Sequence, residues 1–200
     1  LFAMLERYRC LPLPADFWEA ELLPCRMPDY QTGLLDSLFQ EGNLVWVGSD
    51  NQQVTFCNRE DLELMPRPVT GDGTGIEALL PDHYGRYDFG TLMARSQRSA
   101  RDIGETLWRA VWAGAVTNDS VLALRKGIQT NFAVADVVAP QGRRSRMARP
   151  QGFQRWRGSI PFAGNWYRLP EQLPADDLLL MEEQGRDRVR ILIDRYGILF

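Results

Sequence analysis

The sequence has few residues that bind metal ions or form disulfides. It contains one histidine, His83, and three cysteines, Cys10, Cys25 and Cys57. None of the cysteines has a second cysteine or a histidine at the spacing of a zinc site. We therefore expect no metal site, and the scattered thiols indicate a reducing cytoplasm.

Long apolar runs are also missing. No stretch approaches the roughly 18 apolar residues that a membrane span requires, and the first residues have neither the basic start nor the apolar core of a signal peptide. Hydrophobic residues make up 44% and charged residues 24% of the chain, as in ordinary globular proteins. These features predict a cytoplasmic protein without a membrane partner, whose chain begins inside an element that started earlier.

The sequence has no nucleotide-binding loop. A motor domain needs Gly-x-x-x-x-Gly-Lys-Ser/Thr and an acidic pair for magnesium. The glycine-rich run 71–75 contains no lysine, and Lys126 is followed by Gly127. We predict that this chain is not an enzyme by itself, with no catalytic residue, no metal site and no cofactor of its own.

Positive charge is distributed unevenly. The net charge is -3, and Lys126 is the one lysine among 23 basic residues. The stretch from Val137 to Pro170 has no acidic residue but contains seven arginines: Arg143, Arg144, Arg146, Arg149, Arg155, Arg157 and Arg168. Overall charge does not indicate a nucleic-acid partner, whereas this stretch is locally basic.

Residues 1–66 are expected to form a first unit. The expected elements are helices over 2–8, 17–23 and 28–40, strands over 44–48 and 54–56, and a short helix over 59–65. Asp16 caps the second helix and Pro24 ends it; Pro28 starts the third helix and Gly42 ends it. Three helices followed by a hairpin are the order of a winged helix.

Residues 67–137 are expected to form a second winged-helix-like unit after a joint rich in proline and glycine at 66–75. Helices are expected over 76–80 and 87–95. A longer third helix is expected to be capped by Ser99, to run through Ala113 and to be closed by Gly114. A further helix, capped by Asn118 or Asp119, is expected through Leu124. The core side of the third is the stripe Ile103, Leu107, Ala110 and Val111.

The remaining chain divides into an Arg-rich linker at 138–158 and a segment at 159–200. The latter is predicted to hold short strands or an apolar arm, followed by the opening helix of a third, truncated module. The run Met4–Tyr8 is echoed by Leu192–Tyr196, which suggests a repeated opening helix. The predicted fold class is mainly α with small β-hairpins, arranged as tandem winged-helix-like modules.

Several stretches resemble the C-terminal region of the Lhr family of large ATP-dependent DNA helicases, outside the motor domains. The most specific is Trp112-Ala113-Gly114-Ala115-Val116-Thr117-Asn118-Asp119. Others, in the same order as in the family, are Arg26–Tyr30, Leu34–Asp36, Val45–Gly48, Gly164–Tyr167 and Leu192–Gly197.

This resemblance implies a bacterial parent protein active in DNA repair, with two motor domains that bind ATP and magnesium, followed by winged-helix and β-barrel modules. The family's ATPase residues, and the glycosylase carboxylate attributed to its far C-terminus, match no position of this chain. DNA, single-stranded or forked, other modules of the same polypeptide, and further copies of the chain are the implied partners.

Two groups of residues are candidates for nucleic-acid contact. On the third helix of the second unit, Arg98, Arg101 and Arg109 can contact phosphates, or they can pair with Asp102 and Glu105 on a solvated face. In the linker, the candidates are Arg143, Arg144, Arg155, Trp156 and Arg157, since an aromatic ring between arginines can stack on unpaired bases. The alternative is a mobile linker with Trp156 tucked into a neighbouring module.

Other residues that could contact nucleic acid are expected to have packing roles instead. The third helix of the first unit carries Asp29 and Asp36 and no arginine, which disfavours phosphate contact. Trp46, Trp108, Trp112 and Trp166 are typical of core or interface residues, and His83 is expected in a surface loop.

Three hypotheses remain open: an accessory segment that helps a helicase hold or orient nucleic acid, a purely structural or oligomerisation segment, and part of a glycosylase-like repair module completed elsewhere.

Overall fold

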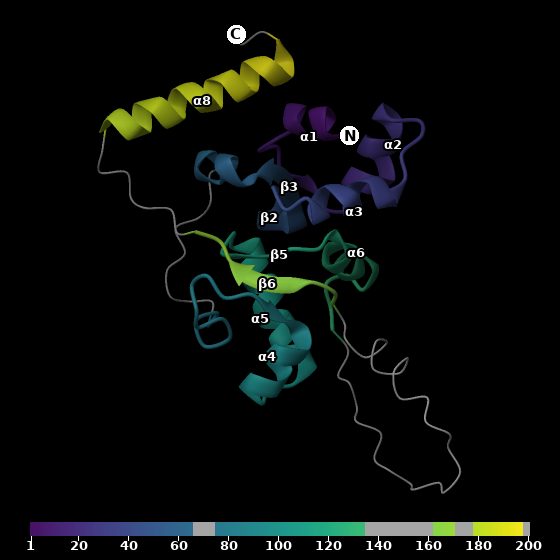
Figure 1. Cartoon of the computed structure of the whole chain (residues 1–200), viewed down its shortest axis with the longest axis vertical. Coiled ribbons are helices and arrows are strands. Elements are labelled where there is room, and N and C mark those ends of the chain that lie inside the picture. Colours follow the sequence, from purple (N-terminus) through teal and green to yellow (C-terminus); the bar gives the residue numbers. More distant parts are fainter. Residues whose placement is uncertain (66–74, 135–161, 171–177, 198–200) are drawn as a thin grey trace, which may run out of the picture.

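The computed structural model describes residues 1–65, 75–134, 162–170 and 178–197. Two small sheets lie next to each other at the centre, each with helices around it, and a long C-terminal helix lies at one end (Figure 1). The predicted Arg-rich linker at 138–158 falls outside the described residues. Among the described residues, no helix is both long and apolar enough to cross a membrane.

The first module has the topology of a winged helix. Its elements are α1 (Phe2–Arg7), β1 (Leu13–Pro14), η1 (Trp18–Leu22) continuing into α2 (Leu23–Arg26), α3 (Thr32–Gln40), β2 (Leu44–Ser49), η2 (Asp50–Gln52), β3 (Gln53–Asn58) and η3 (Arg59–Leu64). The sheet order is β1-β3-β2, so the strand between the first two helices pairs with the last strand of the hairpin. This arrangement confirms the predicted fold of the module.

The prolines of this module do not act as predicted. Pro24 does not end the second helix, because η1 is a π-helix and the chain continues as α2 to Arg26. The wider turn lets the Leu23 amide donate to the Trp18 carbonyl and accommodates the proline ring, which clashes with the carbonyl of residue i−4 in an α-helix. Pro28 lies ahead of α3, which begins at Thr32. Asp16 forms no side-chain cap.

The second module repeats the same strand order. It consists of β4 (Tyr87–Asp88), α4 (Phe89–Ser96), α5 (Ala100–Trp112), β5 (Val116–Asn118), α6 (Val121–Gln129) and β6 (Asn165–Arg168), with the sheet order β4-β6-β5. The strand β6, expected in a separate arm at 159–200, therefore completes the sheet of this module. The connection from β5 to β6, which corresponds to the wing, contains α6.

Two expected helix starts differ in this module. Residues 76–80 form a single turn, in which the Leu80 amide donates to the Ile76 carbonyl over 2.7 Å, and not a helix. The cap of α6 is Ser120, whose hydroxyl accepts from the Leu122 amide, because Asn118 and Asp119 are used by the sheet. The predicted Ser99 cap, and the buried stripe of α5, are confirmed.

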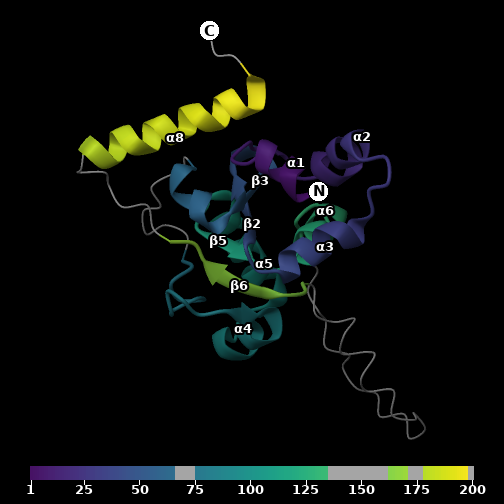
Figure 2. The ribbon, with the colours of Figure 1, turned by 45° about the horizontal axis from the view of Figure 1, so that its top comes forward.

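The two modules share one hydrophobic core. The strands β2 and β5 lie side by side in both ribbon views (Figures 1 and 2). The ring of Trp46 in β2 stacks on Trp108 of α5 at 6.3 Å and meets Trp166 of β6 edge-on at 6.5 Å. The hydroxyl of Thr117 donates to the Trp46 carbonyl over 2.5 Å. Because these contacts are buried, the modules are expected to unfold together.

The C-terminal helix α8 (Leu178–Tyr196) packs across η3 and α1 of the first module. Its one buried residue is Ile191, and Arg188 and Arg195 donate to the carbonyls of Leu64 and Arg9. In the echoed runs, Leu5 is buried whereas its counterpart Ile193 is 45% exposed. The third module, of which α8 is the expected opening helix, stays a prediction.

The thiols provide a test of this packing. Cys57 is buried, Cys10 is half-buried and Cys25 is exposed. Burial, and after it the charge of Asp61, raises the pKa of Cys10 to about 11. We expect a thiol reagent at pH 8 to modify Cys25 rapidly, and Cys10 and Cys57 only on unfolding. Rapid modification of three thiols in the native protein would contradict the packing.

The raised pKa also has a consequence for stability. A thiol whose pKa is higher in the folded protein favours folding below its ordinary pKa of 9.0, and this contribution is lost as the pH rises through about 11.

Candidate nucleic-acid interface

In a DNA-binding winged helix the third helix enters the major groove, so α3 and α5 are the first surfaces to consider. The second module covers part of α3. Arg125 of α6 forms ion pairs with Glu19 at 2.6 Å and with Asp36 of α3 at 2.7 Å, and it donates to the Thr32 carbonyl over 3.0 Å. The charged side of α3 is therefore used in contact between the modules.

The guanidinium of Arg125 has hydrogen-bond partners on all three of its nitrogen atoms. Glu19 accepts from two nitrogens of the Arg125 guanidinium and from the Tyr30 hydroxyl. Burial lowers the pKa of Arg125, but the hydrogen bonds and charges of Glu19 and Asp36 outweigh this effect and raise it. The guanidinium is thus a permanently charged link between the modules, which supports the expectation that α3 has a packing role.

The third helix of the second module, α5, is mostly buried. Its exposed side is a narrow stripe that consists of Arg101, Asp102, Glu105 and Arg109. On the opposite side, β2 of the first module approaches so closely that a Cβ atom on Gly48 would lie 2.5 Å from a methyl group of Val111. The wing of each module therefore packs against the third helix of the other: β2 against α5, and α6 against α3.

The predicted arginines of α5 differ in their surroundings. Arg101 pairs with Glu105 at 2.9 Å, as the solvated-face alternative expected. Arg98 precedes the cap residue Ser99, and Arg109 lies in the last turn; both are exposed, and neither forms an ion pair within the part of the chain that the structure describes. The linker candidates, Arg143, Arg144, Arg155, Trp156 and Arg157, lie outside the described residues.

Two further arginines come together only in the fold. Arg59 and Arg86 lie over the ring of Tyr167, with their guanidinium carbons 5.6 and 4.5 Å from its centre. Arg59 donates to the Tyr167 hydroxyl over 3.3 Å, and Arg86 pairs with Asp119 at 3.4 Å. No sequence signal links these residues, because Arg59 and Tyr167 are 108 positions apart.

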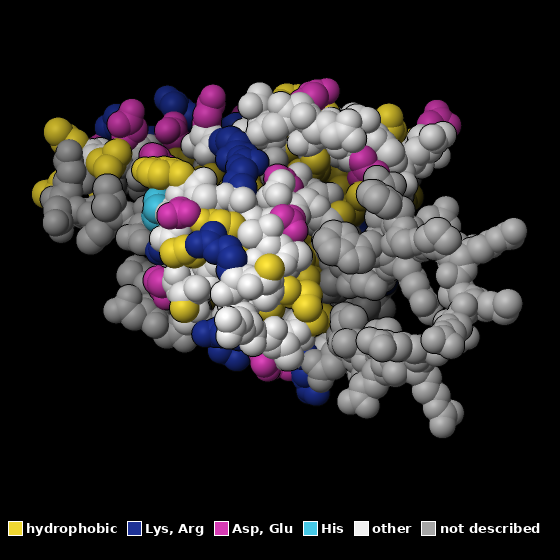
Figure 3. Space-filling model, turned by 60° about the horizontal axis from the view of Figure 1, so that its bottom comes forward, with side chains coloured by type: hydrophobic (Ala, Val, Ile, Leu, Met, Phe, Trp, Pro, Cys, Tyr) yellow, Lys and Arg dark blue, Asp and Glu magenta, His cyan; other side chains and the backbone are white. Residues whose placement is uncertain are grey.

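Charged side chains are dispersed over one face of the described structure. On the face shown in Figure 3, basic side chains occur in small separate groups with acidic and apolar side chains between them. Such a surface differs from the continuous basic stripe that dominates nonspecific DNA binding in many proteins.

The tryptophans are packing residues, as predicted. Trp46, Trp108 and Trp166 are buried, and Trp112 is half-buried and stacks on Trp108 at 5.5 Å. They form the shared core between the sheets, together with Phe162, rather than a platform for bases.

The most specific run of the resemblance has a structural role. Gly114 follows Ala113, the C-cap of α5, and adopts a φ of 67°, which only glycine accommodates without strain. Val116 to Asn118 form β5, and Asp119 accepts hydrogen bonds from the backbone and the side-chain amide of Asn165 at 2.7 and 2.9 Å. The run thus ends a helix, forms an edge strand of the second sheet and anchors the central strand β6.

The two acidic residues near His83 in the sequence have structural contacts of their own. Asp88 caps α4, and its bond from the Thr91 hydroxyl lowers the pKa of the carboxyl, while Asp82 accepts from the Tyr87 hydroxyl. The described residues contain no group of three or more side chains that could hold a metal ion.

Comparison with known proteins agrees with this geometry. Residues 1–66 match the family model described as the winged-helix domain of the large helicase-related protein. The resemblance to the Lhr family is confirmed. The first module is thus similar to the winged-helix domain that this family model describes.

Two curated relatives cover nearly the whole chain. The Lhr helicase/uracil glycosylase of Escherichia coli (strain K12) is 28% identical over 218 residues, which include 98% of this chain and 14% of that protein. The Lhr helicase/probable uracil glycosylase of Mycolicibacterium smegmatis is 25% identical over 215 residues, with 100% of this chain and 14% of that protein. The chain thus spans about one seventh of the length of these two relatives.

Proposed function

We propose that this chain is a non-catalytic segment of a large bacterial ATP-dependent DNA helicase that acts in DNA repair in the cytoplasm. Its two modules form one rigid block, which assembles with other modules of the same polypeptide and contacts nucleic acid with exposed arginines. ATP and magnesium are needed by the motor domains of the parent protein. The observation that supports the rigid block is the reciprocal packing of each wing against the third helix of the other module.

The contact with nucleic acid does not use a third helix in the major groove. The exposed stripe of α5 is narrow and contains two carboxylates. Arg98 and Arg109, at the two ends of this helix, are exposed and have no acidic partner among the described residues. Two such positive charges suit phosphates of a nucleic-acid strand that runs along the outside of the block.

The test is a fluorescence-anisotropy titration of the 200-residue chain with labelled single-stranded and forked DNA over a salt series. We expect binding that weakens as salt increases. Combining Arg98→Ala with Arg109→Ala should lower the salt slope for single-stranded DNA by about 1.4, because each phosphate contact releases about 0.7 counterions. The combined change of Arg143, Arg144, Arg155 and Arg157 to alanine tests the linker in the same way.

A matched control is Arg7→Ala with Arg26→Ala, which removes the same charge from exposed positions of α1 and α2 in the other module. It should leave the salt slope unchanged. If the chain fails to bind either DNA at low salt, or if the control variant loses as much affinity as the α5 variant, the DNA-contact proposal is wrong.

The second candidate is a purely structural or oligomerisation segment. The ion pairs and the shared core between the modules favour it, since they use the surfaces with which winged helices otherwise read DNA. It predicts no DNA binding and, where copies associate, a mass above 22.9 kDa in light scattering.

A glycosylase-like repair role completed elsewhere in the parent predicts uracil excision only by a longer protein.

A further inference from the structure

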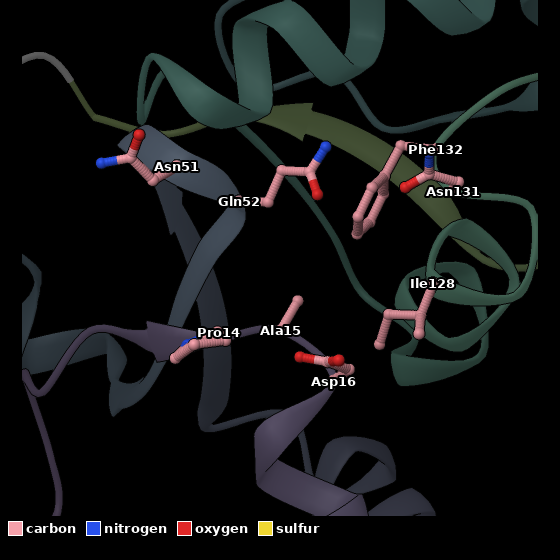
Figure 4. A pocket seen from close by; sticks show the side chains of 8 residues that line it. All are labelled: Pro14, Ala15, Asp16, Asn51, Gln52, Ile128, Asn131 and Phe132. Atoms are coloured by element: carbon pink, nitrogen blue, oxygen red, sulfur yellow. The ribbon is translucent and has the colours of Figure 1, made fainter.

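A cavity of about 150 Å³ lies where the two modules meet. The first module contributes Pro14, Ala15, Asp16, Asn51 and Gln52, from the end of β1, the two residues after it and the tip of the wing. The second contributes Ile128, Asn131 and Phe132, from the end of α6 and the turn after it. Asp16, Gln52, Ile128 and Phe132 project toward the same space (Figure 4).

The polar side chains of this cavity have no partner in the described structure. The carboxylate of Asp16 and the amides of Gln52 and Asn131 form no hydrogen bond or ion pair with another described residue, and they are exposed at the rim. Backbone groups around them do form hydrogen bonds. The Ala15 amide donates to the Gln52 carbonyl over 3.0 Å, and the Phe132 amide donates to the Gly127 carbonyl. The side-chain donors and acceptors therefore remain available to a ligand.

An aromatic ring forms one wall. Phe132 meets Trp108 and Trp112 edge-on, at 4.8 Å from each, with interplanar angles of 69° and 89°. Gly127 lies directly beside it, where a Cβ atom would be 2.8 Å from the ring. This packing holds the ring in place, and together with Ile128 it provides an apolar surface against which a flat ligand can lie.

The backbone conformations at the cavity are unusual. Six described residues other than glycine have a positive φ, and four of them line this cavity: Asn51, Gln52, Asn131 and Phe132, with values between 50° and 61°. The left-handed conformation is unfavourable for glutamine and phenylalanine, and such residues often occur where a chain holds a ligand. Here it directs Gln52 and Phe132 toward each other from different modules.

Charge and size restrict the ligand. The one ionised side chain of the lining is Asp16, so the site repels a phosphate and favours a neutral ligand that donates hydrogen bonds. A cavity of about this volume accepts one six-membered aromatic ring. Carboxylates accept from the N4 amino group of cytosine, and glutamine or asparagine side chains bind base edges.

We propose that the cavity between the modules binds a single unstacked nucleobase with an exocyclic amino group, and that cytosine fits it best. The base lies against Phe132 and Ile128, and its amino group donates a hydrogen bond to the Asp16 carboxylate. The side-chain amides of Gln52 and Asn131 contact its edge at the rim. The proposal deepens the proposed contact with nucleic acid, because it adds recognition of a base to contacts with phosphates.

The experiment is a titration of the ¹⁵N-labelled 200-residue chain with neutral deoxynucleosides, followed by NMR through the side-chain amides and the tryptophan indoles. Deoxycytidine and deoxyuridine form a matched pair of equal ring size. Position 4 carries an amino donor in cytosine and a carbonyl acceptor in uracil, and N3 accepts in cytosine and donates in uracil. We expect deoxycytidine to shift the Gln52 and Asn131 amides with about fivefold higher affinity, which corresponds to one hydrogen bond of about 1 kcal/mol. Asp16→Asn should remove this preference, and Gln52→Ala should weaken both ligands.

The control variant is Gln97→Ala, which changes an exposed glutamine with a φ of 53° outside the cavity, and it should bind as the unchanged chain does. Equal affinities for the two nucleosides, or no shift of the cavity amides up to saturating nucleoside, would overturn the proposal. Because the nucleosides carry no phosphate, salt and the Arg98 and Arg109 changes should not affect this binding. Failure here therefore leaves the phosphate-contact proposal to its own test.

Discussion

Replacing Gly48 with alanine is expected to destabilise the chain by about 3 kcal/mol, at the upper end of the usual cost of overpacking. The added Cβ atom would lie 2.5 Å from a methyl group and 2.6 Å from the backbone carbonyl of Val111 in α5. Neither β2 nor α5 can move away, since both belong to the shared core. Thermal unfolding should show a melting temperature lower by about 6–12 °C for a chain of this size.

The matched control for this change is Gly33→Ala. Gly33 lies in α3, and a Cβ atom there would have no neighbour within 4 Å. Alanine favours a helix by up to about 1 kcal/mol relative to glycine, so this variant should melt at the same or a slightly higher temperature. If Gly48→Ala proved as stable as Gly33→Ala, the close approach of the two modules would be disproved.

Replacing Arg125 with methionine is expected to cost about 2–3 kcal/mol. The change leaves Glu19 and Asp36 without the guanidinium that neutralises them. Breaking a fully buried pair costs about 3–5 kcal/mol, and the smaller figure reflects side chains that are 17–31% exposed. Chemical unfolding of this variant should show a lower midpoint, and the modules should separate more readily.

A double-mutant cycle isolates the interaction from the loss of the side chain itself. The triple variant Arg125→Met, Glu19→Gln and Asp36→Asn should be more stable than Arg125→Met, because it leaves no unpaired carboxylate. Arg186→Met removes an exposed arginine that pairs with Glu182 at 2.6 Å within α8, and it should change stability by about 0.5 kcal/mol or less. Additive effects across the cycle would show that Arg125 does not link the modules electrostatically.

Much of the fold follows from local sequence signals. The hairpin β2–β3, the cap Ser99, the buried stripe of α5 and the glycine at position 114 occur where predicted, because each depends on near neighbours in the chain. The π-helix before Pro24 was not predicted, since proline is normally read as a helix end. The late start of α3 has the same origin, because Pro28 favours a first turn but does not by itself establish a helix.

Less of the candidate site than of the fold could be predicted from the sequence. The pairing of Arg101 with Glu105 could be foreseen, because four positions separate neighbours on a helix. The placement of Arg59 and Arg86 on Tyr167, and the meeting of Gln52 with Phe132, could not be, since each joins side chains from segments far apart in the sequence.

The sequence by itself determined the resemblance to the family, the hairpin β2–β3 and the packing role of the tryptophans, because hydrophobic periodicity and short motifs are local. Only the tertiary structure decided that β6 completes the second sheet, that the wings pack on each other's third helices and that a cavity forms between the modules. These contacts depend on the missing side chain of Gly48, on the ion pairs of Arg125 and on surfaces from distant parts of the sequence. Their contribution to the free energy of folding arises only when both modules are folded together, so no local signal predicts it.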